Sequence, residues 1–137
     1  MKKWKKIIGI AGALAMLLPF AACGAPSTRG GASGAVNKSG KISVGISMPE
    51  QQLERWQIDG ENLKKELEHF GYKVTLQYAD GKTDLQSSQI QNMANQGANY
   101  VVIASIDGTA TGAAAELAES NGAKVIAYDR LIMNTDA

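Results

Sequence analysis

Two neighbouring charged residues, Asp129 and Arg130, follow an apolar run near the end of the chain. The run Lys124 to Tyr128 is typical of a buried strand. An aspartate accepts hydrogen bonds and an arginine donates a planar fork of them, so together they match paired hydroxyl groups such as those of a sugar. The alternative is a surface ion pair at a strand end, which contributes little in water. The position after the strand favours ligand contact.

A second group of candidate residues fills the stretch from Glu50 to Trp56, which is dense in hydrogen-bonding side chains beside an indole. Arg55 and Trp56 together suit a sugar, because the ring can stack on its apolar face while polar groups reach its hydroxyls. The pattern equally allows Trp56 to anchor a helix in the core and Arg55 to pair with Asp59 at the i+4 position. Both interpretations stay open at this point.

Asp107 stands before Gly108 and Thr109, where an aspartate commonly caps the following helix. We favour the cap and keep Asp107 as a weaker ligand candidate. The chain has one histidine and one cysteine, without a glycine-rich phosphate loop or clustered metal-ligand spacing. We therefore predict no catalytic residue, metal site or cofactor. His69 fits a surface position near a helix end.

Short β-branched apolar runs alternate with longer amphipathic segments from Lys41 onward, the pattern of an α/β fold with a parallel sheet and helices on both faces. The strands are predicted at Ile42 to Met48, Lys73 to Tyr78, Tyr100 to Ala104 and Lys124 to Tyr128. The usual doubly wound order is 2-1-3-4, which reverses between the first and third strands. Ligands of such sheets bind at the carboxyl ends of the strands near that reversal.

Three helices are predicted between these strands. The first has an inward face formed by Leu53, Trp56, Gly60, Leu63, Leu67 and Phe70, and it ends at Gly71. The second begins with a capping box, Thr83 to Gln86, and turns Leu85, Ile90, Met93 and Ala94 inward before Gly97. The third covers about Thr109 to Ser120 and stops at Asn121 and Gly122.

The first forty residues carry an export pattern. Residues 1–22 combine four lysines with an apolar run of about fourteen residues and two final alanines, as in a signal peptide. Cys23 follows directly, and Phe20 to Gly24 resembles a bacterial lipobox, which implies that Cys23 receives a lipid. Residues 23–40 are rich in glycine, serine and alanine, so we expect a flexible tether to a folded domain over residues 41–137.

Charge gives no reason to expect a nucleic-acid partner. Removing residues 1–22 would take away four of the fourteen basic residues and none of the thirteen acidic ones, leaving a formal charge of −3. Two or three acyl chains on Cys23 would hold the protein on a membrane without spanning it. We therefore expect an extracytoplasmic, lipid-anchored protein.

Six segments together resemble the N-terminal domain of the xylose and multiple-sugar periplasmic binding proteins, which supply monosaccharides to ABC importers. They are Ile46-Ser-Met-Pro-Glu50, Leu53-Glu-Arg-Trp-Gln-Ile-Asp-Gly60, Leu76-Gln-Tyr-Ala-Asp80, Gln89-Ile-Gln-Asn-Met93, Val102-Ile-Ala-Ser-Ile-Asp-Gly-Thr109 and Val125-Ile-Ala-Tyr-Asp-Arg-Leu-Ile132. The resemblance implies that Arg55, Trp56, Asp129 and Arg130 contact a pyranose sugar. It also implies a type I periplasmic binding protein fold of two domains that close around the ligand, of which this sequence holds an incomplete N-terminal domain.

The resulting hypothesis is the sugar-binding component of an ABC import system, with a monosaccharide and permease subunits as partners. It is a binding protein, not an enzyme. An alternative is a sugar-sensing lipoprotein that presents its ligand to a membrane receptor. A flavodoxin-like or phosphoryl-transfer enzyme is disfavoured by the loop after the first strand. We expect this part of the protein to bind sugar weakly and, with Val125 to Tyr128 at a sheet edge, to be marginally stable or prone to associate.

Overall fold

A parallel sheet of four strands runs through residues 40–137, the part of the chain that the computed structural model describes. The strands are β1 (Ser43–Met48), β2 (Lys73–Tyr78), β3 (Tyr100–Ile103) and β4 (Lys124–Ala127). Their order is β2-β1-β3-β4 and every pair is parallel, so the predicted order is confirmed. The predicted signal peptide, Cys23 and residues 24–39 of the predicted tether lie outside the described residues.

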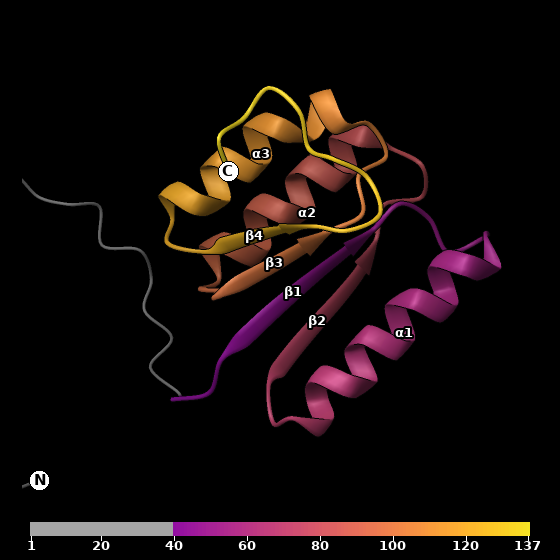
Figure 1. Cartoon of the computed structure of the whole chain (residues 1–137), viewed down its shortest axis with the longest axis vertical. Helices are drawn as coiled ribbons and strands as arrows, with labels where there is room; N and C mark the ends of the chain where they lie inside the picture. The colour runs from indigo at the N-terminus through magenta and orange to yellow at the C-terminus, as the bar shows by residue number, and fades with distance from the viewer. Residues whose placement is uncertain (1–39) are drawn as a thin grey trace, which may run out of the picture.

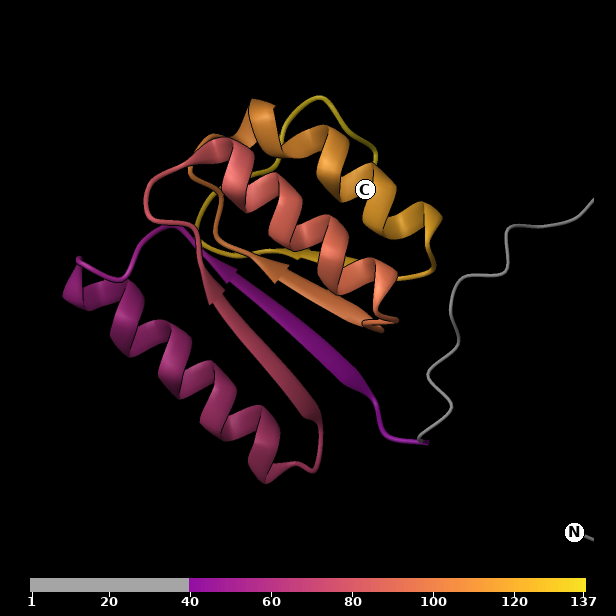
Figure 2. The same cartoon turned by 180° about the vertical axis from the view of Figure 1, so that it is seen from behind.

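Three helices cover the two faces of this sheet: α1 (Glu54–His69), α2 (Thr83–Asn95) and α3 (Gly108–Ser120). Helix α1 lies on one face, and α2 and α3 lie side by side on the other (Figures 1 and 2). This arrangement confirms the predicted α/β architecture. Among the described residues, no helix is long and apolar enough to cross a membrane.

Alternation along β1 supplies a core to each face. Val44, Ile46 and Met48 point to the α1 side, where they form a buried cluster with Trp56 and Val102. The intervening residues face α2. A Cβ added at Gly45 would lie 2.7 Å from the Met93 sulfur, so a larger residue here would force the Met93 side chain to shift. The second core joins α2 and α3 to β3 through Val101, Ile103 and a series of helix alanines.

The predicted inward face of α1 was too long at both ends. Trp56 and Gly60 are buried and Leu63 and Leu67 partly so, but Leu53 and Phe70 are 53% and 71% exposed. Leu53 is the residue before the helix and Phe70 the residue after it, so neither follows the helical rotation that turns the other four inward.

The capping box predicted for α2 is wrong. The N-cap residue is Lys82, and no side chain caps the helix. Thr83 is already the first helical residue, and Gln86 carries its amide into the protein interior instead of back to the helix start. The inward positions Ile90, Met93 and Ala94 are confirmed as buried, with Leu85 half-buried.

The chain after β4 returns across the start of α3. The Met133 amide donates to the Gly108 carbonyl at 3.0 Å. Added Cβ atoms at Gly108 and Gly112 would lie 2.4 and 2.6 Å from the carbonyl oxygens of Leu131 and Met133. Glycine at both positions therefore permits this close crossing.

One part of the α1 face remains open beside β4, which forms an edge of the sheet. A groove of about 240 Å³ lies there, lined by Ile42, Val44, Leu67, Tyr72, Tyr100, Val102 and Ile126. None of the predicted ligand residues lines it. The expected tendency of this edge to associate stays a prediction.

Candidate functional site

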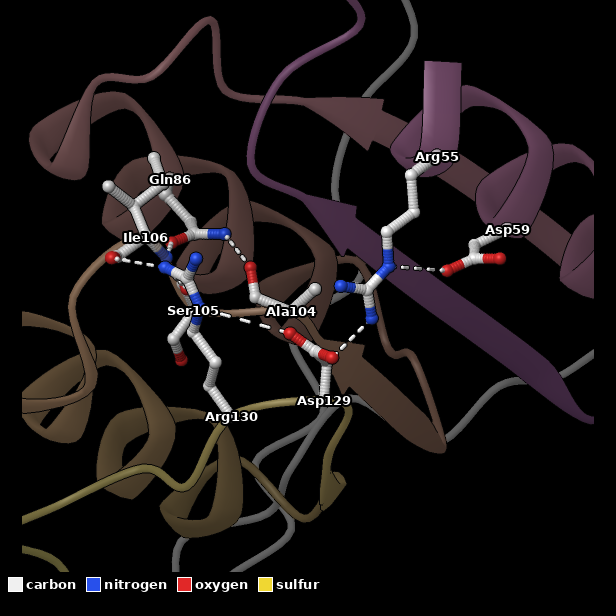
Figure 3. A network of polar contacts seen from close by, with 8 residues as sticks. All are labelled: Arg55, Asp59, Gln86, Ala104, Ser105, Ile106, Asp129 and Arg130. Carbon is white, nitrogen blue, oxygen red and sulfur yellow. Dashed lines mark hydrogen bonds and ion pairs between the residues drawn. The ribbon is translucent and has the colours of Figure 1, made fainter. Parts of the chain in front are cut away.

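The predicted ligand residues gather at the carboxyl edge of the sheet. Arg55 comes from the first turn of α1, and Asp129 and Arg130 from the loop after β4 (Figure 3). This edge lies beside β1 and β3, where the strand order reverses. The topology thus brings together two groups that are 74 residues apart in the sequence.

The Asp129 carboxylate lies between two guanidinium groups. Arg55 Nη2 donates to Asp129 Oδ1, and Arg130 Nε lies 3.8 Å from Asp129 Oδ2. Arg55 Nε also lies 3.6 Å from Asp59 Oδ2. The arginine side chains are 60% and 54% exposed, so these pairs add little to stability and stay accessible from solvent. They offer donors and acceptors that a ligand can exchange for its own.

The neighbouring aspartates favour the charged form of Arg55 at this edge. Its pKa is raised above the ordinary value, first by the hydrogen bond to Asp129 and then by the charges of Asp129 and Asp59, against a lowering by desolvation. A guanidinium is charged at any physiological pH in any case. The site therefore places two arginine side chains beside two aspartate side chains.

Arg130 forms hydrogen bonds with the backbone of the loop after β3. Its Nη1 donates to the carbonyl oxygens of Ser105 at 3.3 Å and Ile106 at 3.0 Å. These bonds hold the guanidinium beside Asp129 while leaving it accessible to solvent (Figure 3). These bonds could not be predicted from residue types, because every residue carries a backbone carbonyl.

Asp129 has an unusual backbone conformation. Its φ is +65°, and the Arg130 amide donates to the Tyr128 carbonyl at 2.7 Å, which makes a tight three-residue turn. Aspartate tolerates positive φ better than most residues, but the conformation is still sparsely populated. Such strain persists where surrounding contacts hold it, and here two arginines contact the Asp129 carboxylate.

Trp56 lies in the core beneath this edge, with 4% of its surface exposed. It packs in the cluster with Val44, Ile46 and Met48, and the Arg55 guanidinium carbon lies 4.6 Å from the centre of its ring. That distance permits a cation–π contact. Of the two interpretations of Trp56, the structure therefore shows the core anchor. Stacking of a sugar on its ring stays a prediction.

Tyr128 and Asp59 connect the charged edge to the core. Burial raises the pKa of the Tyr128 hydroxyl, and a hydrogen bond to the Asp59 carboxylate raises it further. Asp59 in turn pairs with Arg55. Tyr128 was missed as a site residue, although it directly precedes Asp129.

Gln86 was also missed, because its position matched a capping box. Its side chain is 1% exposed and makes three hydrogen bonds. Nε2 donates to the Ala104 carbonyl at 2.9 Å and to the Ser47 hydroxyl at 3.3 Å, and Oε1 accepts from the Ile106 amide at 2.9 Å. Gln86 is thus a buried glutamine that bonds to residues at the carboxyl ends of both β1 and β3.

Asp107 caps α3, as favoured from the sequence. Its Oδ1 accepts from the amides of Thr109 at 2.8 Å and Ala110 at 2.9 Å. His69 lies at the last turn of α1, where its ring meets Phe70 edge-on. Within residues 40–137, no group of three or more histidine, cysteine, aspartate or glutamate side chains is placed to hold a metal ion.

Comparison with known proteins gives the same domain. Residues 44–137 match the family described as "Periplasmic binding protein domain". The chain is 46% identical to the multiple sugar-binding periplasmic receptor ChvE of Rhizobium radiobacter, over 69% of this chain and 27% of the relative. It is 38% identical to the D-xylose-binding periplasmic protein of Escherichia coli K12, over 70% of this chain and 29% of the relative.

Solved structures agree with these relatives. An ABC transporter solute-binding protein from Clostridium phytofermentans, with bound β-D-glucose, is 49% identical at a TM-score of 0.67 and matches 69% of this chain and 29% of its own. Another, from Chloroflexus aurantiacus in complex with D-glucose, is 35% identical at a TM-score of 0.65, over 70% of this chain and 28% of its own. The chain thus spans less than a third of the length of these relatives, over their N-terminal part. The chain belongs to the periplasmic binding protein domain family.

Proposed function

We propose that this chain is part of the monosaccharide-binding component of an ABC sugar import system. The observation that carries the proposal is the Asp129 carboxylate held between Arg55 and Arg130 at the carboxyl edge of the sheet. Relatives with 38–46% identity are named as sugar-binding proteins, and two similar structures contain bound glucose. The protein binds and releases its ligand without chemistry of its own.

The polar edge suits a pyranose ring. Asp129 accepts hydrogen bonds from sugar hydroxyls, and the two guanidinium groups donate to them. These groups pair with one another at exposed positions, so a sugar would replace weak interactions rather than strong ones. Trp56 supports Arg55 from below, and a sugar ring stacks on the indole only if the guanidinium above it moves aside.

This domain supplies one wall of the binding cleft in the proposal. A cleft of two domains encloses the sugar when it closes, as in other hinged binding proteins. Contacts from a single wall leave the ligand open to water, and we expect weak binding from residues 41–137 alone.

Export and anchoring complete the proposal. Residues 1–22 act as a signal peptide, and the lipid on Cys23 holds the protein on the outer side of the cell membrane, where residues 23–40 tether the domain near its permease. Changing Cys23 to serine is expected to move the protein from the membrane fraction to the soluble fraction. A wild-type protein that carries no lipid by mass spectrometry contradicts this part of the proposal.

A second candidate is a sugar-sensing protein that hands its ligand to a membrane receptor. The Rhizobium relative is named a periplasmic receptor, which favours this second candidate. The two candidates share the ligand and differ in the partner.

The test is calorimetry with a panel of monosaccharides. Two proteins are compared: residues 24–137, and the same span extended by any reading frame that continues beyond Ala137. We expect the extended protein to bind one or more monosaccharides and the shorter one to bind weakly. An extended protein that binds no monosaccharide contradicts the proposed function. Copurification with permease subunits or with a sensor then separates the two candidates.

A further inference from the structure

Gln86 lies beside the carboxyl ends of β1 and β3. The last backbone bond between these strands runs from the Ala104 amide to the Ser47 carbonyl at 2.9 Å. Immediately beyond it, Gln86 reaches in from α2 and bonds to Ser47, Ala104 and Ile106. Its amide therefore links the Ser47 hydroxyl near the end of β1 to the backbone that follows β3.

Arg130 also bonds to this short loop, residues 104–106. Gln86 bonds the Ala104 carbonyl and the Ile106 amide, while Arg130 bonds the carbonyls of Ser105 and Ile106. Figure 3 shows the two side chains converging on this backbone from different elements. The Ile106 amide that Gln86 bonds and the Ser105 carbonyl that Arg130 bonds belong to one planar peptide group, so the Gln86 bond restrains the direction of that carbonyl.

We propose that Gln86 is a positioning residue of the ligand site, acting through residues 104–106 on the Arg130 guanidinium and so on Asp129. It does not contact the ligand itself. The inference rests on the proposed function in one respect, the contact between Arg130 and the sugar. The rival explanation is that Gln86 only satisfies buried backbone groups and stabilises the fold.

The test compares Gln86→Met with Gln89→Met. Both residues lie on α2 and both donate to a carbonyl near a strand end. Gln89 bonds Tyr78, the last residue of β2, whereas the carbonyls that Arg130 bonds belong to Ser105 and Ile106. Methionine keeps the length and approximate volume of glutamine and removes its hydrogen bonds. Thermal unfolding first establishes that each variant is folded. If Gln86→Met does not fold, Gln86→Glu replaces it, because the carboxylate still accepts from the Ile106 amide but loses the bond to Ala104.

The first readout needs no sugar. Arg29, Arg55 and Arg130 are the arginines of the chain, so three guanidinium signals are expected in a nitrogen-15 NMR spectrum and Arg130→Lys assigns one of them. We expect Gln86→Met to shift or broaden the Arg130 signal and Gln89→Met to leave it in place. An unchanged Arg130 signal in Gln86→Met overturns the inference.

The second readout is sugar affinity in the extended protein. Gln86→Met is expected to weaken binding about tenfold, roughly the effect of one hydrogen bond, and to add no further loss in an Arg130→Ala background. Equal losses in both backgrounds overturn the inference, since Gln86 would then act independently of Arg130. If the parent binds no sugar, the proposed function fails, and the NMR readout alone decides whether Gln86 positions Arg130.

Discussion

The outer and inner parts of this carboxyl edge are stabilised by different kinds of interaction. The outer part consists of charges, Arg55, Asp129 and Arg130, whose pairs are exposed to solvent. The inner part consists of Gln86 and Trp56, which are almost fully buried and make neutral hydrogen bonds or apolar contacts. Exposed ion pairs are exchanged easily, whereas buried hydrogen bonds are costly to break. The difference suits a site with a rigid floor and a surface free to bind.

Trp56→Ala should have the largest effect on stability, because it disrupts the packing of the inner part. Removing a buried indole leaves a cavity in the α1 core, so we expect the free energy of unfolding to fall by about 3–5 kcal/mol. Urea denaturation of residues 24–137 measures it, with Leu53→Ala, an exposed position, as the control. A loss no larger than the control's would show that Trp56 is not a core anchor.

Gln86→Met should have the next largest effect. It leaves the buried Ala104 carbonyl and the part-buried Ile106 amide without their partner, which costs about 1–3 kcal/mol. Gln89→Met removes a single bond to Tyr78 and should cost less. Equal midpoints for the two variants in the same denaturation experiment would contradict a buried network around Gln86.

Asp107→Ala tests the rim of the site through the start of α3. The carboxylate satisfies two backbone amides, so we expect about 1 kcal/mol of destabilisation. Asp107→Ser should restore most of it because serine also caps helices. If Asp107 instead served mainly the ligand, the alanine change would leave the unfolding curve in place and weaken sugar binding.

Alkaline pH should have the smallest effect on stability, and it acts through Tyr128 at the boundary between the outer and inner parts. The pKa of Tyr128 is raised in the folded state by burial and Asp59, so its stabilising contribution is complete below the unfolded pKa of about 10 and is lost as pH rises through the folded value. Burial raises the pKa of Tyr78 in the same direction. Stability should therefore fall above about pH 10, and less steeply in Tyr128→Phe. An identical slope in parent and variant would contradict the role of Tyr128.

Sequence patterns predicted the architecture well because it depends on local signals. β-branched runs and turn glycines located the four strands, and the reversal between β1 and β3 followed from the usual winding. Leu53 and Phe70 share the helical spacing of the buried residues yet lie just outside α1, which periodicity does not distinguish. Asp107 was predictable because its cap bonds are local.

The inner part of the site was not predictable in the same way. A glutamine in an amphipathic helix usually faces solvent, but Gln86 is buried against Ser47 and Ala104, which lie 39 and 18 residues away in the sequence. Its sequence neighbourhood fitted a capping box, a local explanation that the tertiary contacts override. The choice between the two interpretations of Trp56 likewise depends on how α1 packs on the sheet. Long-range contacts decide such residues.

Arg130→Ala in sugar calorimetry tests the central claim most directly. The measurement uses the protein extended beyond Ala137 and takes Leu131→Ala, a neighbouring exposed side chain, as the matched control. We expect Arg130→Ala to weaken monosaccharide binding about ten- to a hundredfold, as for loss of a charged hydrogen-bonding group, with Leu131→Ala unchanged. Tight sugar binding that survives Arg130→Ala at parental affinity would contradict a ligand site at this edge.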